Sequence, residues 1–148
     1  MRLRAAHYKE VVDISTLLRS RWFENDEEAQ AYVTIKIRSK ETIVAYDESS
    51  LVGVLIFTRN FTHEAHMAEY IVVAKEVRRG GVATSLLEEY IAICTLEQPK
   101  KQPYALSSTD VKNYASIELH KKVGFVELGR IKKLHYGRDE IFWGYKLR

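Results

Sequence analysis

The chain has 148 residues, of which 46% are hydrophobic and 29% charged, and this length and composition fit one globular domain over residues 1–148. Its 23 basic and 20 acidic residues give a formal net charge of +3, which is too balanced to indicate a nucleic-acid partner. A single cysteine excludes an intrachain disulfide, and no segment approaches the roughly 20 apolar residues of a membrane helix. We therefore expect a cytoplasmic protein with no membrane contact.

Helical and extended patterns divide the first half of the chain. Apolar residues at helical spacing predict two helices after a short first strand, and Asn25 or Asp26 is suited to cap the second helix. Apolar, β-branched segments on either side of a polar turn then predict a hairpin. In chain order these segments are a strand at 2–5, helices at 8–21 and 27–37, and strands at 42–46 and 51–57.

The second half alternates strands with helices before it ends in two strands. The expected segments are strands at 67–74, 104–109, 126–136 and 140–147, with helices at 80–96 and 113–123. The complete order is β-α-α-β-β-β-α-β-α-β-β, which predicts an α/β fold with helices packed on a mixed sheet. The two strand–helix–strand units predict parallel pairing in this half, through right-handed crossovers.

The segment between the fourth strand and the third helix has the pattern of an anion site. Two arginines follow the strand, and Gly80 and Gly81 then open the helix. A helix N-terminus leaves backbone N–H groups unpaired and carries partial positive charge, while glycine lets a phosphate approach the backbone closely. An ordinary glycine-rich turn is the alternative. Neither the P-loop spacing nor the G-x-G-x-x-G spacing is present.

Two motifs on these elements resemble one known family. Arg78-x-x-Gly81-x-Ala83 resembles the R/Q-x-x-G-x-G/A signature of the GNAT superfamily of N-acetyltransferases, and residues 113–125 resemble the family's N-x-x-A-x-x-L-Y-x-x-x-G-F. The predicted order of strands and helices also matches, so the resemblance covers nearly the whole chain. His120 stands where the family often has a catalytic tyrosine, and Lys75 where it often has proline.

The resemblance implies a site for coenzyme A and a fold that is GNAT-like throughout. Acetyl-coenzyme A would be the co-substrate, with no metal, and the acceptor would be a small-molecule or peptide amine. Family members often form homodimers, so a homodimer is also open. The resemblance assigns cofactor binding to Ile71, Val72, Val73, Arg78, Arg79, Gly80, Gly81, Val82, Ala83, Thr84, Asn113 and Ser116.

Glu69 and His120 are the candidate catalytic residues. Glu69 lies on the fourth strand, where some family members place a base, although a surface or salt-bridged role is the alternative. His120 shares a helical stripe with Asn113 and Ser116, while Ala115, Leu119 and Val123 form a separate apolar stripe that we expect to face the core. In the family the polar stripe faces the cofactor, so the resemblance implies that His120 points to it and protonates the departing thiolate, unless His120 only packs or hydrogen-bonds locally.

Two further features leave their roles open. Ser107 and Thr109 place hydroxyls on the fifth strand, where the family is usually apolar, so they either bind substrate or cap the next helix. The resemblance places the acceptor site beside the first two helices and the last hairpin, which offer Trp22, Phe23, Glu24, Asp26, Tyr136 and Arg138. An aromatic and acidic wall would suit a cationic amine, or Trp22 and Phe23 simply close the core.

Acyl transfer from an acyl-coenzyme A, most simply acetyl, to a primary amine by direct attack through a tetrahedral intermediate is the expected function. A non-catalytic acyl-coenzyme A-binding module of the same fold is one alternative, and a nucleic-acid-binding protein that uses the basic pairs is another. The sequence does not name the acceptor or exclude a longer acyl group.

Overall fold

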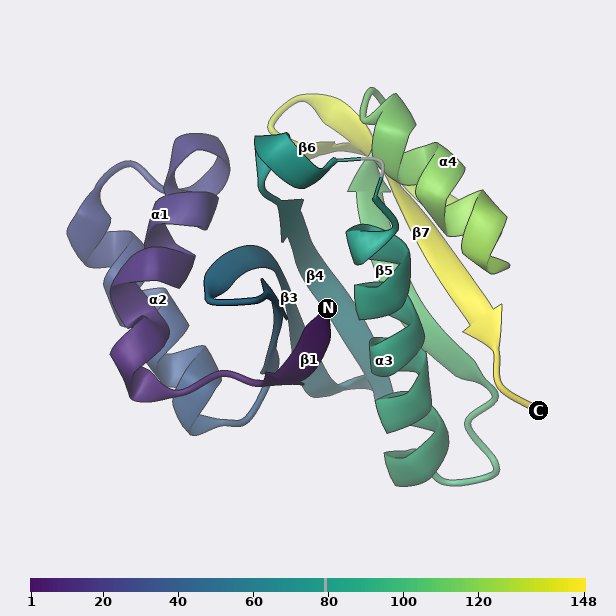
Figure 1. Cartoon of the computed structure of the whole chain (residues 1–148). Helices are drawn as coiled ribbons and strands as arrows, with labels where there is room; N and C mark the ends of the chain where they lie inside the picture. The colour runs from purple at the N-terminus through teal and green to yellow at the C-terminus, as the bar shows by residue number, and fades with distance from the viewer. Residues whose placement is uncertain (79) are drawn as a thin grey trace. The chain divides into compact units, whose positions relative to one another are not determined.

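The computed structural model describes residues 1–78 and 80–148, together with all their side chains except those of residues 19–21. The strands form one mixed sheet in the order β1-β2-β3-β4-β5-β7-β6 (Figure 1). Their bounds are β1 Arg2–Ala5, β2 Thr42–Asp47, β3 Ser50–Thr62, β4 Ala65–Val73, β5 Tyr104–Asp110, β6 Val126–His135 and β7 Arg138–Lys146. The helices are η1 Tyr8–Glu10, α1 Val11–Trp22, α2 Asp26–Arg38, η2 Lys75–Val77, α3 Val82–Glu97 and α4 Tyr114–Val123.

The predicted α/β class, mixed sheet and order of elements are confirmed. No helix in the described ranges is long and apolar enough to cross a membrane. By its contacts the chain divides into two compact units, one of residues 1–57 and 70–86, the other of residues 58–69 and 87–148. That residues 1–148 are one domain stays a prediction.

The first unit has a core between α1, α2 and the strands of its part of the sheet. The two helices lie side by side (Figure 1), and α2 begins where the Asn25 side chain accepts a hydrogen bond from the Glu28 amide. That bond satisfies one of the amides that a helix start leaves unpaired. Buried apolar side chains of the two helices and of the strands meet in one cluster of Ile14, Leu18, Val33, Ile37, Val44, Val54, Ile56 and Val72.

The second unit is built around β5, which pairs with strands on both sides. Met67 and Ala68 of β4 pair in parallel with Leu106 and Ser107. On the other side β5 pairs antiparallel with β7 along its whole length. The parallel β4–α3–β5 pairing that the sequence predicts is therefore confirmed.

The prediction of parallel pairing between β5 and β6 is wrong. Strand β7 lies between them and pairs antiparallel with both. The cause is the tight turn at Tyr136 and Gly137, whose φ angles are 48° and 91°. This turn folds β7 straight back along β6, so that β7 takes the place beside β5.

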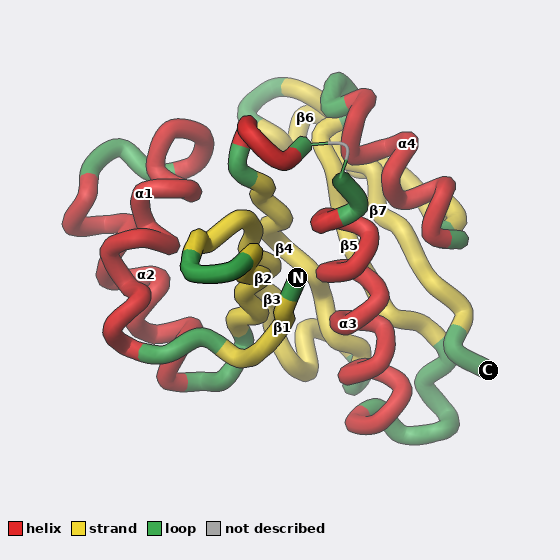
Figure 2. The backbone as a smooth tube through the Cα atoms, viewed as in Figure 1, coloured by secondary structure: helices red, strands yellow, loops and turns green. Residues whose placement is uncertain are grey.

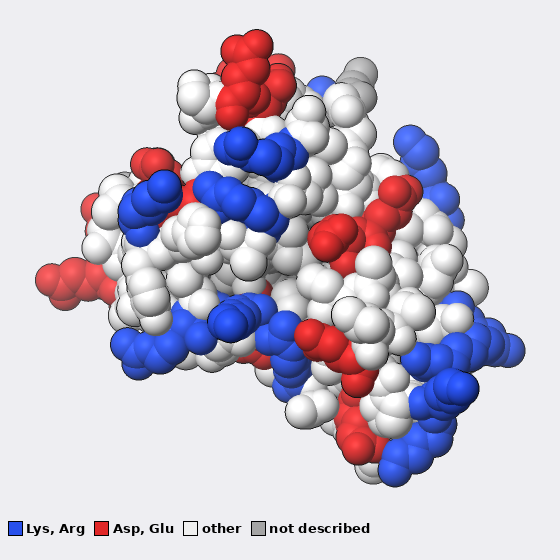
Figure 3. Space-filling model, turned by 60° about the horizontal axis from the view of Figure 1, so that its bottom comes forward, with Lys and Arg blue, Asp and Glu red and all other residues white. Residues whose placement is uncertain are grey.

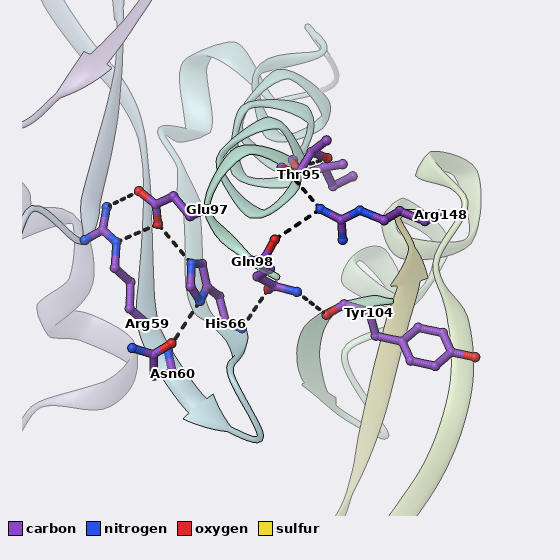
Figure 4. A network of polar contacts seen from close by, with 9 residues as sticks. Arg59, Asn60, His66, Thr95, Glu97, Gln98, Tyr104 and Arg148 are labelled. Carbon is purple, nitrogen blue, oxygen red and sulfur yellow. Dashed lines mark hydrogen bonds and ion pairs between the residues drawn. The ribbon is translucent and has the colours of Figure 1, made fainter. Parts of the chain in front are cut away.

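The C-terminal end of α3 is fixed by a network of polar contacts (Figure 4). Arg59 binds both carboxylate oxygens of Glu97, at 2.7 and 3.1 Å, and the buried His66 contacts the same carboxylate at 2.9 Å. The Arg148 guanidinium donates to four carbonyl groups at this helix end, those of Thr95, Gln98, Pro99 and Gln102. A cation at a helix C-terminus complements the helix dipole, so this network stabilises the helix end opposite the glycine loop.

Candidate functional site

The glycine loop joins the end of β4 to the start of α3. After Val73 the chain makes the short turn η2, and α3 begins directly after Gly81 (Figure 2). Gly81 has φ +83°, and no atom lies within 4 Å of the position that a Cβ would take there. Only glycine adopts this conformation without strain. The space over Gly81 is therefore open to a ligand group that touches backbone.

The first turn of α3 supplies donors next to that space. The Ser85 amide donates to the Gly81 carbonyl at 3.0 Å, which is the first bond of the helix. The amides of Val82, Ala83 and Thr84 precede this bond, so they have no acceptor within the helix. Exposed Arg78 donates to the Val73 carbonyl at 3.4 Å. Arg79, the other arginine of the loop, lies outside the described residues.

A pocket of about 470 Å³ adjoins the loop within the first unit. It is lined by Met1, Asp47, Glu76, Val77, Arg78, Gly80 and Val82. Two carboxylates in this lining would repel a phosphate, whereas Arg78 and the helix start would attract one. An anion is therefore favoured at the glycine end of the lining.

Successive residues at the end of β4 alternate between the core cluster and a less buried face of the strand. Val72 is 5% exposed and belongs to the core cluster, and Tyr70 packs against that cluster. Ile71 and Val73 are half-buried and alternate with them. Their assignment to the pantetheine arm stays a prediction.

Trp22 and Phe23 of the proposed acceptor wall pack against tyrosines of the same unit. The ring centroids of Trp22 and Tyr70 lie 4.7 Å apart, and those of Phe23 and Tyr32 lie 5.2 Å apart. All four side chains are half-buried against the core cluster. Closing the core is therefore the role that their contacts support.

The second group of candidate residues lies in the other unit, at the start of α4. The Asn113 side chain caps this helix by accepting from the Ser116 amide at 3.2 Å. Asn113 is exposed and Ser116 half-buried, so groups of the first turn of α4 reach the surface of their unit.

His120 lies in a different environment from the one predicted. It is 1% exposed, whereas Ala115 is exposed and Leu119 and Val123 are half-buried. The prediction that the Ala115 stripe faces the core and His120 points away from it is wrong. The physical reason is an aromatic slot, in which the imidazole stacks on Trp143 and meets Phe125 edge-on.

Burial controls the ionisation of His120. It lowers the pKa of the imidazole, and the hydrogen bond to the Ser116 carbonyl opposes that effect only in part. The ring is therefore neutral at physiological pH. Ser107, the nearest hydroxyl, lies 2.8 Å from the ring and is itself buried.

Glu69 lies on β4 and is half-buried, and its carboxylate accepts a hydrogen bond from the Thr58 hydroxyl of the neighbouring strand. A carboxylate held in one orientation is suited to accept a proton, and equally to a structural role. Among the described residues, no three histidine, cysteine, aspartate or glutamate side chains are grouped to hold a metal ion.

Sequence reasoning missed a second polar group beside β5. Asp110 at the end of this strand binds Arg138 at 2.6 Å, and His135 contacts Glu140 at 3.0 Å. Asp110 and Glu140 are opposite each other in the β5–β7 pairing. The long-range register that places them together has no local signal in the sequence. Arg138 therefore pairs within the protein, while the neighbouring Tyr136 is 90% exposed.

Charged groups of both signs cover the face drawn in Figure 3, where Lys and Arg stand beside Asp and Glu. This mixture agrees with the balanced composition.

The chain was then compared with known proteins. Residues 11–125 match the model of a family described as the acetyltransferase (GNAT) family. The comparison with curated proteins gave no match. Many solved structures share the fold.

Three of these structures cover almost the whole chain. A GNAT family acetyltransferase from Bacillus cereus is 23% identical, with 98% of this chain and 96% of that chain covered and a TM-score of 0.80. The ribosomal-protein-alanine N-acetyltransferase of Brucella melitensis is 24% identical, with 99% of each chain covered and a TM-score of 0.79. A chain of the NatC complex bound to Gag peptide and CoA is 16% identical, with 99% and 98% covered and a TM-score of 0.80.

At these identities the structural matches establish the fold, whereas the family model spans well over half of the sequence. Acetyl transfer from acetyl-coenzyme A is general for proteins that match it. The glycine loop, the sheet order and the family model agree, and this chain belongs to the GNAT family of acetyltransferases.

Proposed function

We propose that this protein transfers an acetyl group from acetyl-coenzyme A to a primary amine by direct attack through a tetrahedral intermediate. The observation that carries the proposal is the open space over Gly81, beside the amides of the first turn of α3. A pyrophosphate needs backbone donors, positive charge and close access to the main chain. Val82, Ala83, Thr84 and Arg78 would provide donors, Gly81 would provide the access, and Gly80 precedes it in the loop.

The family motifs assign further cofactor contacts to residues of β4 and, in the other unit, to residues of α4. Ile71, Val72 and Val73 would offer backbone groups to the pantetheine arm, and one N–H near Val72 or Val73 would stabilise the oxyanion. Asn113 and Ser116, at the start of α4, would contact the cofactor as the family motif implies. Arg79 is part of the proposal because a second arginine before the glycines can add a charge-assisted hydrogen bond to a phosphate.

The attacking amine must be neutral, so it has to lose a proton during the reaction. We assign Glu69 as the acceptor of that proton, directly or through water, because Thr58 already orients its carboxylate. His120 is buried and neutral, which argues against an imidazolium acid in this conformation.

A small-molecule amine or a peptide N-terminus is the proposed acceptor. Among proteins of similar fold, one is named for acetylation of a ribosomal-protein alanine and another was solved with a peptide and CoA. We place the protein in the cytoplasm because its single thiol, Cys94, suits a reducing compartment.

Calorimetry with coenzyme A tests the cofactor site. Gly81→Glu should abolish binding, because it places a side chain and a negative charge in the space for the phosphate. Gly81→Ala adds the backbone strain without the charge, and should therefore lower the affinity less.

Gly137→Glu is the matched control. Gly137 also has positive φ, at +91°, and open space around its Cβ position, but it lies in the β6–β7 turn. Equal affinities of the wild type and Gly81→Glu would refute the pyrophosphate assignment. If the wild type binds coenzyme A but releases no thiol from acetyl-coenzyme A with any of a panel of amines, the chain is a non-catalytic binding module.

A further inference from the structure

His120 occupies the family's tyrosine position, and both of its ring nitrogens are within hydrogen-bond reach of a partner. Nδ1 lies 2.7 Å from the Ser116 carbonyl oxygen, and Nε2 lies 2.8 Å from the Ser107 hydroxyl. Ser107 also lies 3.4 Å from the carbonyl oxygen of Ala68. Ala68 and Ser107 are paired residues of β4 and β5.

These partners determine which nitrogen carries the proton. A carbonyl oxygen only accepts, so Nδ1 must donate to Ser116. In the neutral ring Nε2 then has no hydrogen, and it accepts the hydroxyl hydrogen of Ser107. This is the Nδ1–H tautomer, and it links α4 to β5 through one buried hydrogen bond.

We infer that neutral His120 is a positioning residue that ties the cofactor-binding start of α4 to β5, and that it does not supply a proton to the departing thiolate. The inference rests on the proposed function, in which Asn113 and Ser116 bind coenzyme A. The ring reaches Ser116 directly, and Asn113 caps the same turn.

The surroundings of the ring agree with this role. Trp143 of β7 stacks on it and Phe125 meets it edge-on. Ser107 of β5 faces Nε2, and Lys121 and Lys122 on its own helix are exposed. The groups packed on the ring are thus hydroxyl or aromatic, and burial by protein atoms alone leaves no face for a sulfur atom.

Protonation would reverse the Ser107 bond. Nε2–H would donate to the Ser107 oxygen, and the freed hydroxyl hydrogen would turn to the Ala68 carbonyl. The catalytic reaction near neutral pH involves only the neutral arrangement.

The first test is the ¹⁵N NMR signature of the His120 ring, assigned by its loss in His120→Gln. The inference expects a protonated Nδ1 and an unprotonated Nε2 throughout pH 6.5–8. This range begins at about the unperturbed pKa of histidine, roughly 6.5. An Nε2–H tautomer, or a charged ring at pH 7, would overturn it. This readout does not depend on activity, so it stands apart from the proposed function.

The second test is a double-mutant cycle on coenzyme A affinity. His120→Phe keeps the aromatic packing and Ser107→Ala removes the hydroxyl, and each should weaken binding on the order of tenfold, about the effect of one buried hydrogen bond. The double variant should bind no more weakly than either single variant. Independent, multiplying losses would overturn the link between the two residues.

Two further variants separate positioning from general destabilisation. His120→Gln can still bond to Ser107 and should recover most of the affinity. Tyr90→Phe removes another buried hydrogen bond to β5, from α3 to the Leu106 carbonyl at 2.6 Å, and should leave the affinity within about twofold. Equal losses in Tyr90→Phe and His120→Phe would contradict the positioning role.

Kinetics complete the test. The fall of kcat at high pH, if there is one, should be the same in the wild type and in every active variant of residue 120. His120→Phe should raise KM for acetyl-coenzyme A more than it lowers kcat. An alkaline limb in the wild type that disappears in His120→Phe would instead identify His120 as the acid. A wild type that binds no coenzyme A would refute the proposed function, while the tautomer would still be measurable.

Discussion

A buried carboxylate in the first unit should make this protein sensitive to acid. Glu10 is 2% exposed, and it accepts two hydrogen bonds from the Arg4 guanidinium at 2.8 and 2.9 Å. The Tyr46 hydroxyl and the His7 amide also donate to it. Burial raises the pKa of Glu10, but these donors outweigh burial and lower it from 4.5 to about 2.

The size of the effect follows from linkage. A difference of roughly 2.5 pKa units at about 1.36 kcal/mol each gives about 3 kcal/mol of stability. Because the folded pKa lies below the unfolded one, this contribution is fully present above pH ~5 and is lost as the pH falls towards ~2. By pH 3 the wild type should have lost about 2 kcal/mol from this one group.

Urea unfolding of the wild type and Glu10→Gln at pH 7 and pH 3 measures this term. The difference in unfolding free energy between the two proteins should shrink by about 2 kcal/mol at the lower pH, and other carboxylates cancel in the comparison. Glu127→Gln is the control, since Glu127 also binds an arginine, Arg130, but at the exposed surface. A difference between wild type and Glu10→Gln that is the same at both pH values would refute the reasoning.

Two other variants test how the structure supports catalysis. Glu69→Gln should lower kcat by roughly 10²–10⁴-fold with little loss of coenzyme A affinity if Glu69 is the base; steady-state kinetics decide this, and an effect below a few-fold would leave it a structural role. Gly53→Ala would place a Cβ 2.8 Å from Val82 and 3.1 Å from Leu86 at the start of α3. This variant should destabilise the protein by about 1–3 kcal/mol in urea unfolding and weaken coenzyme A binding. The control Gly129→Ala should do neither, because its Cβ would meet no atom within 4 Å. An unchanged coenzyme A affinity in Gly53→Ala would show that the glycine loop tolerates a shift of α3.

The elements that the sequence predicts well are those fixed by local chemistry. Asn25 caps α2 because its side chain reaches an amide three residues away, and Ile14 and Leu18 face the core because one helical period separates them. The glycine loop belongs to the same class, since the positive φ of Gly81 and the unpaired amides of α3 are properties of a few consecutive residues.

The errors arose where distant segments decide the structure. Strand β7 enters between β5 and β6 because of a turn and a register that span most of the C-terminal half. Helical periodicity separated two stripes on α4, but only the aromatic slot of Trp143 and Phe125 determines which stripe is buried. The contact between His66 and Glu97 joins residues 31 positions apart, so no local pattern indicated it.

The chain departs from its family at two positions that the structure joins. A histidine stands at the tyrosine position of α4, and a serine stands on β5 where the family is usually apolar. A buried polar group costs free energy unless it is hydrogen-bonded, so either residue alone would be unfavourable in this slot. Ser107 supplies the hydrogen that Nε2 of His120 accepts, and the imidazole gives the hydroxyl a closer acceptor, at 2.8 Å, than the Ala68 carbonyl at 3.4 Å. The two departures are therefore coupled, because each residue supplies a hydrogen-bond partner to the other. A chain with only one of them should be less stable than a chain with both or with neither.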